Sequence, residues 1–173
     1  DAGFGLESLP GIVLGSPEGG DGGSGGLDVL SLGREGIIIL EMSDLGIIDG
    51  EGPDLIVFEN AFSGWLETGY VAVSQDGETW HEWPCEADNS EAGFPGCAGT
   101  ESVLMNSDSD IDPTDLSATG GDAFDLADLG IDKARYVRIR DSGLNEHAYG
   151  GITGGFDLDA IMVTNWEVLD GED

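Results

Sequence analysis

The sequence predicts an all-β protein built as a two-sheet β-sandwich. Its 173 residues, of which 30 are glycine, fall into short runs of β-branched and other apolar residues separated by turn signals. No apolar stripe with helical spacing extends beyond two turns, and the one helical turn that we expect lies within 123–129. A chain of this length supports one core, so we expect residues 1–173 to form a single domain.

Nine short segments carry the expected strands, and their number and turn spacing are typical of a sandwich. They are 11–14, 27–32, 36–42, 46–48, 55–60, 70–75, 79–83, 134–140 and 158–164. Residues 70–83 (YVAVSQDGETWHEW) alternate, turn at Asp76-Gly77 and resume, which predicts a hairpin because aspartate and glycine tolerate the positive φ angles of a tight turn. In 134–141, Val137 and Ile139 alternate with polar residues, so one face of this strand should pack into the core and the other should face solvent.

Two low-complexity segments interrupt the strands. The first, 17–26 (PEGGDGGSGG), has six glycines in ten residues and is expected to be a flexible or tightly turning connector. The second, 106–128, is dense in aspartate and is expected to be a long acidic loop. No internal repeat of fixed period is present, which makes a solenoid unexpected.

The charge balance limits the partners. The chain has 36 acidic and 5 basic residues, a net charge of −31. Nucleic acid and anionic membranes are excluded as partners, because binding to phosphate requires a basic surface. No segment approaches the roughly 20 apolar residues that span a bilayer, so membrane insertion is not expected either. The partner should be cationic, neutral or a metal ion.

The two cysteines predict a disulfide. Cys85 and Cys97 flank a loop-like segment without histidine, and two cysteines alone make a poor zinc site. A Cys85–Cys97 bond indicates an oxidising compartment outside the cytoplasm. We therefore expect a secreted, extracellular or cell-surface protein.

Many of the acids occupy positions that could bind calcium, because calcium takes six to eight oxygen ligands in flexible geometry. Asp157 and Asp159 are two residues apart, so in an extended chain their like charges share one side, and a cation would relieve the repulsion. Asp54 and the pair Glu59-Asn60 bracket an apolar strand, so their oxygens should emerge at its two ends. The predicted Ca²⁺ ligands are Asp54, Glu59, Asn60, Asp108, Asp110, Asp112, Asp122, Asp125, Asp157 and Asp159.

Other interpretations of the acids remain open. Asp108, Asp110 and Asp112 echo the start of an EF-hand loop, but Pro113 stands where that loop needs glycine and Thr119 where it needs glutamate. An irregular loop site is still possible there. An acidic, lysine-poor surface can also serve only solubility or tolerance of salt, which explains the total charge but not its clustering.

The hairpin (V-S-x-D-G-x-x-W from Val73) and the strand that begins A-R-Y-V-R-I at Ala134 resemble the discoidin-type, galactose-binding-like jelly roll over 55–164. Residues 52–61 (GPDLIVFENA), 120–128 (GGDAFDLAD) and 155–160 (GFDLDA) are similar to a group of secreted bacterial cell-surface proteins. The resemblance implies an exported sandwich without an established activity. Relatives of the wider group bind sugars through end loops and hold a structural calcium ion. A calcium-dependent carbohydrate-binding module using 143–155 is therefore the alternative function.

An enzyme is not expected. The chain has two histidines, no G-x-S-x-G elbow, no H-E-x-x-H and no Walker lysine. A glycosidase needs only two carboxylates and stays possible on composition, although the four tryptophans are scattered.

The basic residues suggest an interface. Tyr136, Arg138 and Arg140 form an outward cationic stripe, which either neutralises neighbouring acids or receives an acidic patch of another copy or another surface protein. We therefore expect a non-enzymatic, calcium-binding structural or adhesive domain of a bacterial surface, matrix or filament that associates with itself when divalent cations offset the repulsion.

Overall fold

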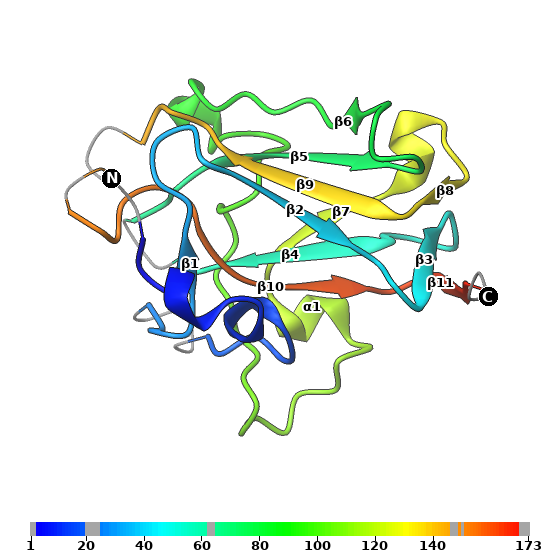
Figure 1. Cartoon of the computed structure of the whole chain (residues 1–173), viewed down its shortest axis with the longest axis horizontal. Coiled ribbons are helices and arrows are strands. Elements are labelled where there is room, and N and C mark those ends of the chain that lie inside the picture. The colour runs from blue at the N-terminus through cyan, green and yellow to red at the C-terminus, as the bar shows by residue number, and fades with distance from the viewer. Residues whose placement is uncertain (1–2, 20–24, 62–64, 146–148, 150, 170–173) are drawn as a thin grey trace.

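A computed structural model describes residues 3–19, 25–61, 65–145, 149 and 151–169, and within them the chain is mostly antiparallel β-sheet. The predicted all-β class is confirmed. Two four-stranded sheets face each other, and a small third sheet lies at one end of the molecule, near the C-terminus (Figure 1). The arrangement is sandwich-like.

The strands keep a simple order in each sheet. The first sheet runs β1 (Leu30–Ser31), β10 (Asp157–Val163), β4 (Leu55–Glu59), β7 (Asp122–Phe124). The second runs β2 (Ile37–Glu41), β9 (Tyr136–Asp141), β5 (Gly69–Ser74), β6 (His81–Glu82). The third runs β11 (Trp166–Val168), β3 (Leu45–Ile48), β8 (Lys133–Ala134). Short helices occupy the connections: η1 (Leu6–Ser8), η2 (Gly11–Val13), η3 (Ser90–Ala92), α1 (Leu116–Thr119) and η4 (Leu126–Leu129).

The main core lies between the two larger sheets. The predicted alternation of β9 is confirmed, because Val137 and Ile139 are fully buried while the residues between them are half-buried. The rings of Trp83 and Phe124 meet at 5.1 Å between centroids and close the core beside η4. Burial of these side chains supplies the main driving force for folding.

Strand β4 is covered on both faces. Leu55 and Val57 belong to the main core, whereas Ile56 and Phe58 belong to a second cluster with Val103 and Ala160 on the other face. This second face explains why β4 is a continuous apolar run and not an alternating one. By the same alternation, Glu59 at the end of β4 lies on the side of the main core.

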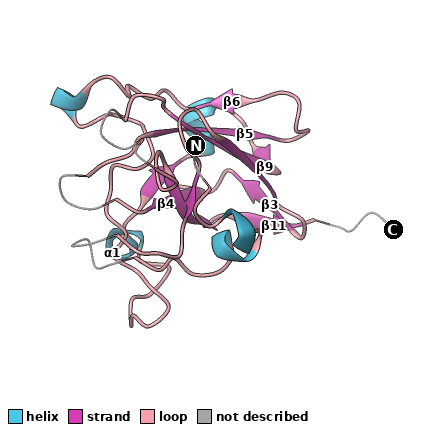
Figure 2. Ribbon diagram, turned by 60° about the vertical axis from the view of Figure 1, so that its left-hand side comes forward, coloured by secondary structure: helices cyan, strands magenta, loops and turns pink. Residues whose placement is uncertain are grey.

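The acidic segment 106–128 is not a single loop. It contains α1, which begins after Asp115, whose carboxylate accepts a hydrogen bond from the Ser117 backbone N–H. Leu116 of α1 packs on the second cluster, and Figure 2 shows α1 outside the sheets. Of the connector 17–26, residues 20–24 lie outside the described residues.

Some predicted elements differ in the structure. In the predicted strand 11–14, residues Gly11–Val13 form η2 and not a strand: the Val13 N–H donates to the carbonyl of Pro10, and the period of a short apolar run cannot distinguish a helical turn from a strand. The hairpin loop is wider than predicted, because the Asp76 carboxylate accepts from the N–H groups of Glu78 and Thr79 and delays β6 until His81. Strands β7 and β11 were not predicted from the sequence.

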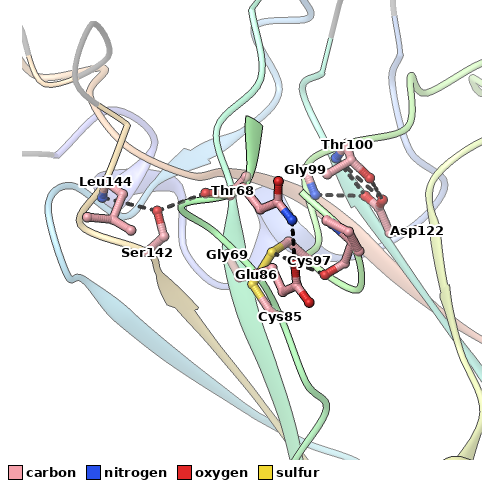
Figure 3. The surroundings of a disulfide bond; sticks show 12 residues. Thr68, Gly69, Cys85, Glu86, Cys97, Gly99, Thr100, Asp122, Ser142 and Leu144 are labelled. Carbon is pink, nitrogen blue, oxygen red and sulfur yellow. Dashed lines mark hydrogen bonds between the residues drawn. A yellow bond between two sulfur atoms is a disulfide. The ribbon is translucent and has the colours of Figure 1, made fainter. Parts of the chain in front are cut away.

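The predicted disulfide is confirmed: Cys85 and Cys97 are joined and enclose η3. The bond holds the outer loop against the start of β5, where Ala98 pairs with Gly69 (Figure 3). Gly99 follows, with φ +83°, and a Cβ there would lie 2.1 Å from the Glu67 carbonyl oxygen, so only glycine fits this approach.

We expect the double substitution Cys85→Ala/Cys97→Ala to lower the free energy of unfolding by about 3 kcal/mol, because it frees a short loop in the unfolded chain. Urea unfolding followed by tryptophan fluorescence measures the change. Reduced wild-type protein is the control and should match the variant; equal stability of the variant and the oxidised protein would contradict the expectation.

Candidate metal centre

Three aspartates from separate segments converge at one end of β4. Asp49 follows β3, Asp54 precedes β4, and Asp125 precedes η4. One carboxylate oxygen from each lies within 4.8 Å of the other two, a spacing that allows all three to hold one metal ion. We call Asp49, Asp54 and Asp125 the aspartate triad.

Asp54 is the fixed member of the triad. It is fully buried, and its Oδ1 accepts from the Gly50 N–H at 3.0 Å and from the Asn165 side-chain amide at 2.8 Å. Its Oδ2 accepts one hydrogen bond from the described residues, from the Leu126 N–H at 2.8 Å. Because a carboxylate oxygen has two lone pairs, Oδ2 retains capacity for a further ligand.

The other two members are more accessible. Asp125 caps η4 through Oδ1, which accepts from the Ala127 N–H at 2.8 Å. Asp49 is exposed, and the pKa of its carboxyl is raised by partial desolvation first and then by repulsion from Asp54, Asp125 and Asp132. A bound cation would favour the ionised form of all three.

No basic side chain neutralises the triad within the described part of the chain. The ion pairs found there join Lys133 to Glu167, Arg135 to Glu41, and both Arg138 and Arg140 to Glu82. The fifth basic residue, Arg34, donates to the Gly143 carbonyl and stacks over Tyr149. The triad is thus left with like charges only.

Three other predicted ligands form hydrogen bonds with backbone groups. Asp122 is buried and accepts from the Gly99 N–H and from both the N–H and the hydroxyl of Thr100 (Figure 3). Asp159 accepts from the Glu18 N–H through both oxygens, at the point where β10 shifts its register against β4. Asn60 exchanges two hydrogen bonds with the backbone of Gly26.

The structure does not bring Asp108, Asp110 and Asp112 into a metal-binding group among the described residues. The Asp112 carboxylate accepts from the N–H and hydroxyl of Thr114, and these bonds lower its pKa. The segment remains an exposed acidic surface.

The last two predicted ligands, Glu59 and Asp157, are buried together with Glu67 at the opposite end of β4 from the triad. Desolvation, followed by repulsion from Glu67 and Asp157, raises the pKa of Glu59 well above its usual value. Desolvation first, and the charges of Asp157 and Asp141 next, raise the pKa of Glu67 to about 8. Desolvation likewise raises the pKa of Asp157 to about 6.

Sequence reasoning did not select Asp49 or Glu67. Asp49 directly follows the apolar residues of β3, and the same position beside an apolar strand end was the reason for selecting Asp54. Glu67 lies in a stretch without an apolar run or an acidic cluster, and it is buried two residues before Gly69, which pairs with Ala98. No local pattern could have identified Glu67.

The predicted interface residues are engaged within the chain. Arg138 lies over the Trp80 ring and Arg140 over the Tyr70 ring, at 4.6 and 4.2 Å from the centroids. The Tyr136 hydroxyl donates to Glu41. In the predicted glycan loop 143–155, residues 146–148 and 150 lie outside the described residues, and the Tyr149 hydroxyl donates to the buried Asp141.

Comparison with protein-family models, with curated proteins and with solved structures found no match to this chain. The helices in the described residues run for at most four residues, and none has the length and apolarity to cross a membrane.

Asp159 generates a pH prediction. Desolvation raises its pKa to about 7, although the Glu18 N–H opposes the shift. An acid with a pKa higher in the folded than in the unfolded chain stabilises the fold fully below its unfolded pKa, about 4, and this stabilisation is lost as the pH rises through the folded value. In EDTA, the melting temperature of the wild type should therefore fall by several degrees between pH 5 and pH 8, and Asp159→Asn should make this fall smaller.

The matched control is Asp112→Asn. The pKa of Asp112 is lowered, so its contribution is already complete above pH 4 and its loss cannot change the slope between pH 5 and pH 8. Identical slopes for Asp159→Asn and the wild type would contradict the assignment of Asp159.

Proposed function

We propose that this protein is a non-enzymatic, calcium-stabilised structural or adhesive domain of a bacterial surface or matrix, built as a galactose-binding-like jelly roll. The observation that carries the proposal is the aspartate triad, whose three carboxylates converge without a basic partner among the described residues. The role of the ion is to join β3, β4 and η4, the elements that these aspartates flank.

The ligand set favours calcium. All three ligands are carboxylates, which suit hard cations, and water can complete the six to eight oxygens that calcium takes. Zinc prefers histidine nitrogen and cysteine sulfur, and both cysteines are used in the disulfide. The open position of Asp49 leaves room for water ligands.

The disulfide supports a location outside the cytoplasm, where such bonds persist. Extracellular calcium-binding modules work with dissociation constants of roughly 0.1–1 mM. A site with three protein ligands is expected to bind calcium weakly, within that range. Extracellular calcium would still keep such a site occupied.

Calcium addition to the chelated protein should raise the melting temperature. At a calcium concentration of 100 times Kd the free energy of unfolding rises by about 2.7 kcal/mol, which corresponds to roughly 5–11 °C for a chain of this size. Asp49→Asn should remove at least half of this rise, and Asp44→Asn, an exposed change outside the triad, should retain it. Differential scanning calorimetry decides, and an unchanged melt of the wild type in EDTA and in calcium would refute the proposal.

Association between copies is the second part of the proposal. The ion pairs of Arg138 and Arg140 with Glu82 are partly exposed, and such pairs contribute about 0–1 kcal/mol, so acids of another copy can replace Glu82 at small cost.

We expect calcium to increase the sedimentation coefficient of the wild type at about 0.1 mM protein. Arg138→Ala should abolish the increase and Arg34→Ala, outside the stripe, should not. A calcium-loaded wild type that sediments as a monomer would rule out self-association through this stripe.

A further inference from the structure

We propose that Glu59, Glu67 and Asp157 form a second divalent-cation site, enclosed within the sandwich at the opposite end of β4 from the aspartate triad. We call these three residues the inner site. Asp54 and Glu59 are five residues apart along β4 and a strand rises about 3.4 Å per residue, so about 17 Å separate the backbones of these two residues. The inner site does not depend on the triad.

The topology brings the three carboxylates together. Glu59 ends β4 and Asp157 begins β10, and the Asp157 N–H donates to Glu59 Oε1 at 3.3 Å. Ser31 of β1 pairs directly with Asp157. Glu67 enters from the segment before β5 and acts on Glu59 as its strongest neighbouring charge.

Each of these side chains presents a buried oxygen that lacks a hydrogen-bond partner in the described structure. These atoms are Glu59 Oε2, Glu67 Oε1, Asp157 Oδ1 and the hydroxyl of Ser31. Their residues are 1, 4, 7 and 3 % exposed. A buried carboxylate oxygen without a partner is costly, and several of them in one place require a ligand or protons.

Among the described residues, no basic side chain forms an ion pair with Glu59, Glu67 or Asp157. The neighbouring charges that act on Glu59, Glu67 and Asp157 are all acidic, and they include Asp122 and Asp141. Those two acids already hold the backbone: Asp122 accepts from Gly99 and Thr100, and Asp141 accepts from the N–H groups of Glu35, Gly143 and Phe156. The buried oxygens without a hydrogen-bond partner in the described part of the chain are therefore those of the inner site and of Ser31 beside it.

The inner site is more open than the triad. The ligand oxygens of Glu59, Glu67 and Asp157 do not all lie within 4.8 Å of one another, as those of the triad do. A cation between them would favour the ionised form of these acids and draw the two glutamate side chains inward. The ligands would then be carboxylates with the Ser31 hydroxyl beside them, an all-oxygen set that suits calcium.

Terbium luminescence can separate the two sites, because Tb³⁺ replaces Ca²⁺ and emits when an excited tryptophan lies close to it. The Trp65 side chain hydrogen-bonds to Glu67, and Trp83 donates to the Asp125 carbonyl at 3.0 Å. Trp65 therefore reports the inner site and Trp83 the triad. Trp65 is 43 % exposed, so Trp65→Phe should fold normally.

We expect wild-type protein to bind two Tb³⁺ ions that calcium displaces. Glu67→Gln should bind Tb³⁺ at the inner site with at least a tenfold weaker affinity, and so lose one ion and most of the Trp65-dependent emission. Asp49→Asn should lose the ion of the triad and keep the Trp65-dependent emission. Trp65→Phe should keep both ions and lose the emission of the inner site. The isosteric Glu67→Gln should also melt higher than the wild type in EDTA at pH 8, because it removes a buried charge.

Two results would overturn the inner site. One is that Glu67→Gln binds as many ions as the wild type with unchanged affinity. The other is that Trp65→Phe leaves the emission unchanged while Asp49→Asn abolishes it, in which case protons alone neutralise the buried acids. Failure of the triad gives the opposite pattern, with unchanged binding by Asp49→Asn. Should Glu67→Gln fail to fold, the Trp65→Phe spectra decide alone.

Discussion

The structure depends on the imbalance between carboxylates and cations. With 36 acids and 5 bases, the chain cannot neutralise its buried acids by ion pairs, and four of its five basic side chains pair with glutamates on the surface. Burial of a charge without a partner is among the most destabilising features that a core can contain. The fold meets this constraint with backbone N–H groups, with raised pKa values that favour the protonated form of buried acids, and with positions suited to a metal ion.

Backbone N–H groups donate hydrogen bonds to some of the buried carboxylates. Asp54, Asp122 and Asp141 each accept several N–H hydrogen bonds, and each fixes a loop against the end of a strand. These acids act as structural anchors. The carboxylates that retain free oxygens collect at the two ends of β4, which is the strand covered on both faces.

The sequence predicts the parts of this arrangement that depend on local pattern. The all-β class, the disulfide and most strands follow from turn residues, apolar runs and cysteine count. The position of acids at both ends of β4 was also predicted, since Asp54 and Glu59 bracket its apolar run. What could not be predicted depends on long-range pairing: Asp49 directly follows β3 of the third sheet, and Glu67 is buried next to the segment in which Gly69 pairs with Ala98. Aspartate density was a poor guide, because Asp108, Asp110 and Asp112 serve an exposed segment whereas sparse acids line the interior.

The pairing of β1 with β10 has a consequence for the order of folding. Leu30 and Ser31 meet Leu158 and Asp157, and β4 reaches its full set of partners only through the same C-terminal strand. Closing such long loops is entropically costly, so contacts of this kind form late and slow the acquisition of the native state. A chain synthesised from its N-terminus therefore keeps β4 without its partner β10 until residues 157–163 have been made, and the mutual repulsion of its acids keeps neighbouring unfinished copies apart during that time.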